Sequence, residues 1–154
     1  MALPDEKMRE LLTRWSNGNK QAAEFMMNLA AITRLADNIA DGDSENIVSD
    51  MADLLYRTTI TLQLDPFYME NKIALFPVMA NAILAWKVSE KWRKSEDGKA
   101  RMFAYIYREL VEQVMWTTAV LTGGMDHAMS VVEDLFKESH SNSGETFEDW
   151  LKGD

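Results

Sequence analysis

Apolar residues recur every three or four positions along most of this chain, and glycine or proline interrupts the pattern at intervals. This spacing places apolar side chains on one face of an α-helix, whereas a half-buried strand requires strict alternation. The sequence contains no alternating segment of useful length. Hydrophobic residues make up 47% of the 154 residues, which is ordinary for a chain that buries one core. The sequence therefore predicts an all-α single domain.

Turn-forming residues divide the chain into about six expected helices. They cover residues 4–16, 19–41, 44–64, 66–94, 99–122 and 126–137, with Pro4 opening the first and Ser44 as N-cap of the third. Pro77 lies inside the fourth segment, where an interior proline removes a helical hydrogen bond, so we expect a kink or two helices there. Gly123 and Gly124 should end the fifth helix. Because the connections are short, the expected arrangement is an antiparallel helical bundle.

The bundle domain is expected to comprise residues 1–138, and residues 139–154 are expected to form a flexible acidic tail. The tail begins with a polar, glycine-containing run, and three of its residues could form one short helix: Phe147, Trp150 and Leu151. The longest apolar stretch of the chain, from Ile73 to Trp86, is interrupted by Pro77 and is too short to span a membrane. We therefore expect a buried core helix in that stretch.

The chain carries 16 Lys and Arg residues against 25 Asp and Glu residues, for a formal net charge of −9 at pH 7. This excess of negative charge disfavours nucleic acid and anionic membranes as partners, because both attract cationic surfaces. The absence of cysteine removes disulfides and thiolate metal ligands, and it fits a reducing compartment. The first residues lack the basic and apolar regions of a signal peptide, so we predict a cytoplasmic protein.

The helix expected over residues 19–41 carries two lines of side chains that both begin as apolar. The first line is apolar throughout: Phe25, Leu29, Ile32, Ala36 and Ile39. The second line continues from apolar residues into carboxylates: Met26, Ala30, Thr33, Asp37 and Asp41. A helix that is apolar on two sides is typical of a bundle interior, so Asp37 and Asp41 are expected to face inward.

Two inward carboxylates one turn apart repel each other, and a hard divalent cation turns this repulsion into attraction. Mg²⁺ takes one or two carboxylates and keeps several waters or substrate phosphates as further ligands. The sequence therefore predicts a Mg²⁺ site at Asp37, Asp41 and Asp43. The structural alternative stays open: Asp37 and Asp41 could be hydrogen-bonded to Arg34 or to neighbouring helices, and Asp43 could serve as a turn or cap residue.

The segment Leu35–Asp43 resembles the first aspartate-rich motif of the squalene and phytoene synthases, within the class I terpenoid synthases. In that family a helix carrying Asp-Asp-x-x-Asp lines the bundle cavity and holds Mg²⁺ against an isoprenoid diphosphate. The resemblance implies that Asp37 and Asp41 occupy the outer aspartate positions, with Asn38 in place of the second aspartate. The segment Asp126–Asp134 loosely resembles the family's second acidic motif, with Asp134 where Glu is expected. The resemblance implies a Mg²⁺-dependent, diphosphate-binding protein.

A second, more general resemblance concerns the start of the chain. The residues Trp15–Gly18, followed by an acidic helix end, are similar to the start of small helical bacteriophage proteins of unknown function. That resemblance implies a possible phage origin and no particular activity.

Other candidate ligands are few. Glu109 and Glu112 lie three residues apart on the expected fifth helix, but di-iron bundles use Glu-x-x-His and no histidine follows a glutamate at that spacing. His140 is expected to be solvated in the polar tail, and His127 to lie on the surface near a helix start. No nucleophile triad is predicted, because the chain lacks cysteine and a suitably placed histidine.

No complete catalytic set is visible in the sequence. The first prediction of function is therefore a non-catalytic helical protein that forms homo-oligomers or binds a protein partner. The 11 methionines are most simply core residues, and three of the 5 tryptophans could mark an oligomer face: Trp86, Trp92 and Trp116. The alternative is the Mg²⁺-dependent, diphosphate-binding protein that uses Asp37 and Asp41.

Overall fold

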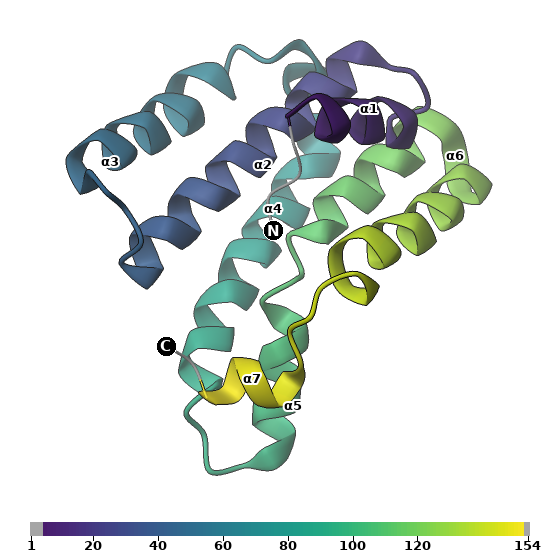
Figure 1. The fold of residues 1–154 in the computed structure, drawn as a ribbon. Helices are drawn as coiled ribbons and strands as arrows, with labels where there is room; N and C mark the ends of the chain where they lie inside the picture. The colour runs from purple at the N-terminus through teal and green to yellow at the C-terminus, as the bar shows by residue number, and fades with distance from the viewer. Residues whose placement is uncertain (1–4, 153–154) are drawn as a thin grey trace. The chain divides into compact units, whose positions relative to one another are not determined.

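A computed structural model describes residues 5–152, and all regular structure in that range is helical (Figure 1). The all-α prediction is confirmed. The α-helices are α1 (Asp5–Trp15), α2 (Lys20–Asp41), α3 (Ile47–Tyr56), α4 (Pro66–Trp92), α5 (Gly98–Tyr107), α6 (Glu112–Phe136) and α7 (Phe147–Lys152). Two π-helical segments follow α3 and α6: η1 (Arg57–Thr61) and η2 (Lys137–Ser141). Pro4, which was expected to open the first helix, lies outside the described residues.

The chain forms two compact units, with the boundary between Lys72 and Ile73 inside α4. In the first unit, α1 and α2 are joined by the expected Asn17–Gly18 turn, where both residues have positive φ. Asn19 caps α2 by accepting a hydrogen bond of 3.0 Å from the backbone N–H of Ala22. The core of this unit is built from three segments that bury aromatic and aliphatic side chains: Leu11, Leu12, Trp15, Phe25, Met26, Leu29, Phe67 and Tyr68.

Helix α2 is buried only along its first half. Its buried residues end at Leu29, and the positions that follow are half-buried or exposed. Phe25 anchors the buried half, with its ring centroid 5.5 Å from that of Phe67 and 6.3 Å from that of Tyr68. Gly42 ends the helix in the left-handed region, with φ 80°, and its N–H donates to the carbonyl of Asn38.

Helix α3 lies beside α2 and has no buried residue (Figure 1). It begins later than the sequence predicted, because Asn46 rather than Ser44 is its N-cap. The side chain of Asn46 accepts a 3.0 Å hydrogen bond from the N–H of Ser49, whereas the hydroxyl of Ser44 donates to Asp50 at 2.6 Å.

In the second unit, α4 continues through Pro77 as one helix. Of the two alternatives expected there, a kink or two helices, the division into two helices is therefore wrong. Pro77 and Ile73 are both exposed, and water can therefore serve the carbonyl that the proline leaves without a donor. The expectation of a buried core helix is met on one face only: Leu75, Ala82, Ala85 and Ser89 are buried and the opposite face is exposed. By length and composition, α4 is the one helix of the described residues that could cross a membrane, so the expectation that this stretch is too short is not met. Only 17% of its most apolar window is buried, and a single such helix is a weak indication of a membrane span.

The expected fifth helix, over residues 99–122, is divided in the structure. Helix α5 ends at Tyr107, residues 108–111 form turns, and α6 begins at Glu112. The predicted break at the glycine pair is confirmed, because Gly124 has φ 78° and ψ −176° and interrupts α6. The second half of α6 runs back from this break along the first half (Figure 1).

The short helix α7 packs against α5 through Trp150, which is 5% exposed. The guanidinium of Arg93 lies 4.9 Å from the Trp150 ring centroid, and that of Arg108 lies 5.6 Å from it. The ring of Tyr105 contacts the same indole at 5.3 Å between centroids. Arg93 also donates a hydrogen bond to the carbonyl of Trp150. The end of the described chain is therefore held by aromatic and cation–π contacts to Trp150 and by a hydrogen bond to its backbone carbonyl.

Candidate metal centre

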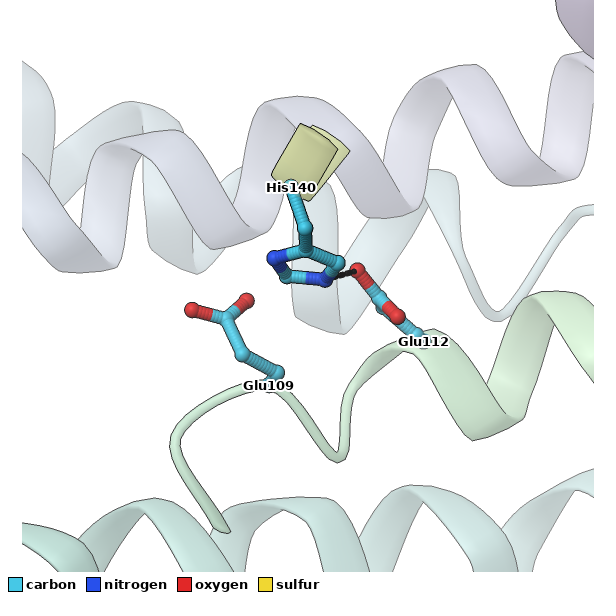
Figure 2. Close-up of side chains that lie close together, drawn as sticks. All are labelled: Glu109, Glu112 and His140. Atoms are coloured by element: carbon cyan, nitrogen blue, oxygen red, sulfur yellow. Dashed lines mark hydrogen bonds and ion pairs between the residues drawn. The ribbon is translucent and has the colours of Figure 1, made fainter. Parts of the chain in front are cut away.

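Three potential metal ligands meet in the second unit: Glu109, Glu112 and His140 (Figure 2). Each offers one ligand atom, and these atoms all lie within 4.8 Å of one another. All three residues are half-buried, so the group is neither an exposed acidic patch nor sealed from water. In the described residues this is the one group of three or more carboxylates and imidazoles with such spacing.

The fold brings these residues together from three local structures. Glu109 lies in the turn between α5 and α6, and Glu112 is the first residue of α6. His140 lies in η2, which continues directly from α6. Because α6 reverses direction at Gly124, its continuation returns to the level of its own first turn, and His140 reaches Glu112 there (Figure 2).

The closest contact in the cluster joins His140 and Glu112, with 2.7 Å between Nε2 and Oε1. The two side chains are 26% and 15% exposed, respectively. Burial raises the pKa of Glu112 above its ordinary value, the nearby His140 acts to lower it, and Glu109 acts to raise it. The Glu112 carboxylate is thus poorly hydrated, and a positive charge beside it is favourable.

Arg108 neutralises part of the negative charge around the cluster. Its Nε lies 2.6 Å from Oε1 of Glu109, and its Nη2 lies 2.6 Å from Oε2 of Glu145. Burial acts to lower the pKa of Arg108, but the two carboxylates outweigh it and raise the pKa, so the guanidinium stays charged. A cation at the cluster would therefore compete with Arg108 for Glu109.

The donor set constrains which ion could be held. Zinc lies about 2.0–2.2 Å from nitrogen and oxygen ligands, so two ligand atoms on one ion are at most about 4.4 Å apart. The observed limit of 4.8 Å means that small side-chain rotations would close the group around an ion. An imidazole nitrogen with two carboxylates suits borderline divalent ions, whereas Mg²⁺ and Ca²⁺ prefer oxygen ligands.

The aspartates predicted from sequence lie elsewhere and are exposed. Asp37 and Asp41 lie on the second half of α2, and Asp43 follows the Gly42 cap. They do not form a group of three ligand atoms like that of Glu109, Glu112 and His140. The expectation that Asp37 and Asp41 face inward is not met, because burial on α2 ends at Leu29. The Mg²⁺ site itself stays a prediction.

From the sequence, Glu109 and Glu112 are candidate ligands, whereas His140 is expected to be solvated. The signal that could have found the histidine is the glycine pair near the midpoint between residues 112 and 140. A helix that reverses at that point brings its two ends together. A search for Glu-x-x-His on one helix cannot detect ligands that meet in this way.

Comparisons with family models, with curated proteins and with solved structures find no match to this chain. The resemblances to the terpenoid synthases and to bacteriophage proteins therefore stay predictions. What the site can bind is therefore inferred from its geometry alone.

Proposed function

We propose that this protein binds a borderline divalent metal ion, such as Zn²⁺ or Mn²⁺, at Glu109, Glu112 and His140. The observation that carries the proposal is the convergence of one imidazole and two carboxylates within 4.8 Å. The ion would supply the positive charge that the partly desolvated Glu112 lacks. The histidine nitrogen disfavours Mg²⁺ at this position, so Mg²⁺ is retained only for the aspartates of α2.

The role we propose for the ion is structural rather than catalytic. It would connect the first turn of α6 with η2, and so hold the chain that leads to α7. Three protein ligands leave a position for water, and Glu145 is held near the cluster by Arg108. Because Glu112 and His140 must lose any proton they share before they can bind a metal, affinity should fall on acidification.

Isothermal titration with Zn²⁺, Mn²⁺ and Mg²⁺ tests the proposal. Glu112→Gln and His140→Gln should each weaken Zn²⁺ binding by at least about 100-fold, since even indirect ligand partners contribute about 10–100-fold. His127→Gln is the matched control, because His127 is the other of the chain's 2 histidines and lies outside the cluster. The affinity of the His127→Gln variant for Zn²⁺ should equal that of the unmodified protein.

A paired variant separates the two predicted sites. Asp37→Asn with Asp41→Asn should leave Zn²⁺ binding unchanged if the cluster is the site. Loss of binding in this variant, or the absence of saturable Zn²⁺ and Mn²⁺ binding to the unmodified protein, would overturn the proposal. Circular dichroism of each variant establishes that the helices are intact.

Self-association is a second candidate function, and it is favoured by a separate observation. Large apolar side chains are exposed on α3, α4, α5 and α6, including Val48, Ile73 and Met125 at 75%, 89% and 68%. Large contiguous apolar patches on soluble proteins mark interaction sites. We propose that the protein forms non-catalytic assemblies through some of these faces, which the metal titration does not test.

A further inference from the structure

This protein has two exposed apolar faces, one with acidic residues at one end and the other with lysines at one end. The α3 face lies on α3, η1 and the turn that follows, and its members are 43–75% exposed: Ile47, Val48, Met51, Leu55, Ile60 and Leu64. The opposite side of the same segment carries the half-buried or buried positions, such as Leu54 and Leu62. The five-residue π turn keeps Ile60 on the side of Leu55.

The α4 face lies opposite the buried positions of α4, and its members are 61–89% exposed: Ile73, Phe76, Ile83 and Leu84. No charged residue occurs between Ile73 and Trp86. Lys87 and Lys91, both exposed, continue the same helical stripe at four-residue spacing. The α4 face is therefore apolar for three turns, with the exposed Lys72 directly before it. Its C-terminal end has a net positive charge, because Lys87 and Lys91 outweigh the exposed Glu90 beside them.

The α3 face has the complementary charge at its N-terminal end. The exposed acidic residues Asp41, Asp43 and Glu45 directly precede it. Lys91 lies about 27 Å from Ile73 along α4, and the α3 face has a similar length from Glu45 to Leu64 at about 1.5 Å per residue. In antiparallel orientation the acidic end of one face therefore meets the lysine end of the other.

We propose that the α3 face of one copy of this chain binds the α4 face of a second copy, antiparallel, with the acidic residues before α3 paired to Lys87 and Lys91. This inference rests on the self-association given above as the second candidate function. Each copy carries both faces and can take part in two such contacts, which together bury about 1,000 Å² of side-chain area if each exposed side chain contributes roughly 50 Å². The charge pairs add orientation to each contact.

A charge-swap experiment tests the proposal by light scattering and sedimentation at low ionic strength. The acidic-side variant is Asp43→Lys with Glu45→Lys, and the basic-side variant is Lys87→Glu with Lys91→Glu. Each alone should associate about tenfold more weakly than the unmodified protein, because like charges then face each other. A mixture of the two variants should restore association, since every α3–α4 contact between one variant and the other again pairs opposite charges.

Two controls make the result specific. A chain that carries all four substitutions should associate with itself as the unmodified protein does. Lys20→Glu with Lys99→Glu changes charge by the same amount at exposed positions outside both faces and should leave association unchanged.

Each failure has a different meaning. An unmodified protein that associates but whose variants are not rescued by mixing would overturn the interface while self-association stands. A protein that is monomeric at high micromolar concentration would overturn both, and co-sedimentation of that monomer with vesicles of phosphatidylcholine and phosphatidylserine would assign the apolar faces to a membrane surface. A four-substitution chain that stays monomeric under conditions where the unmodified protein associates would also overturn the proposal.

Discussion

Nε2 of His140 lies 2.7 Å from Oε1 of Glu112, although 28 positions separate the two residues in the sequence. The contact joins the two ends of one helical segment that reverses at Gly124. Since both side chains are mostly buried, the pair ties η2 to the start of α6 even before any ion is considered. The reversal at Gly124 is therefore the feature on which the candidate metal centre depends.

Substitution of the glycine pair should destabilise the protein. Gly124→Ala places a side chain at φ 78° and ψ −176°, a region that is almost exclusive to glycine, at a cost of about 1–3 kcal/mol. Gly123→Ala would bring a Cβ against the imidazole and the Cβ of His127, so His127 must shift and not only rotate its ring. Thermal unfolding measures both effects, and zinc affinity should fall in Gly124→Ala as the ligands separate.

The control for these substitutions is Gly144→Ala. A Cβ at Gly144 has no heavy atom within 4 Å, and the backbone there is not in the strained region. Its stability should match that of the unmodified protein. Equal unfolding temperatures for Gly124→Ala and Gly144→Ala would show that the break in α6 imposes no strain.

Removal of the Trp150 indole should release the end of the chain. Trp150→Ala deletes a buried ring that contacts Tyr105 and lies beneath the guanidinium groups of Arg93 and Arg108. Truncation of a buried aromatic side chain costs about 3–5 kcal/mol. Because α7 is terminal, we expect local detachment before global unfolding. Hydrogen exchange should show lost protection in residues 146–152, whereas Trp150→Phe should keep most of it. Unchanged protection in Trp150→Ala would contradict the docking role of the ring.

The start of α7 should respond to acid through a capping box. The Thr146 hydroxyl donates to Oδ2 of Asp149 at 2.7 Å, the Thr146 N–H donates to the same oxygen, and the Asp149 N–H donates back to the hydroxyl. These hydrogen bonds lower the pKa of Asp149 below its usual 3.8. The contribution of the Asp149 carboxylate to the stability of α7 is therefore complete above pH 3.8, and it is lost as pH falls through the lowered pKa.

An NMR titration of the Asp149 carboxyl checks this sign. The midpoint should lie below 3.8 in the unmodified protein and move upward in Thr146→Ala. The two proteins should then differ in the order of α7 at neutral pH and converge in strong acid. A midpoint at or above the ordinary value in the unmodified protein would contradict the capping geometry.

In the first unit, Arg57 should stabilise the contact between η1 and α2. Its Nη1 donates a 3.1 Å hydrogen bond to Oδ1 of Asn28, which is 7% exposed. Arg57→Ala leaves this buried acceptor without its donor, at a cost of about 1–3 kcal/mol. Asn28→Leu combined with Arg57→Ala should cost less than the sum of the single changes, which a denaturation cycle measures. Strict additivity would mean that the hydrogen bond contributes nothing.

The parts of the fold that were predictable are those controlled by local chemistry. Apolar spacing predicted helices throughout, and Gly18, Gly42 and Gly124 all adopt the positive φ that glycine allows at helix ends and breaks. The separation of α5 from α6 was not predictable in this way. The apolar spacing runs through residues 103–114 without a glycine or proline, so no local signal marks the turns at residues 108–111.

The functional residues depended on tertiary structure, which sequence patterns report poorly. The stripe from Met26 to Asp41 predicted inward carboxylates, but a stripe cannot tell whether a neighbouring helix covers its whole length. Here burial stops at Leu29, and Asp37 and Asp41 are exposed. His140 was expected to be solvated because it lies in a polar segment, but the reversal of α6 brings it to Glu112, which is remote in sequence.

The π-helical segment η2 determines the direction in which the side chains after α6 point around the helix axis. A π turn holds one residue more than an α turn, as a single-codon insertion into a helix would produce. Deleting one residue from the segment Lys137–Ser141 would restore the α-helical phase and rotate the downstream chain by about 100°, which turns His140 away from Glu112. Insertion of a single codon could therefore have created this cluster in an ancestor, and deletion of one could remove it from a descendant. In both cases the remaining helices keep their order.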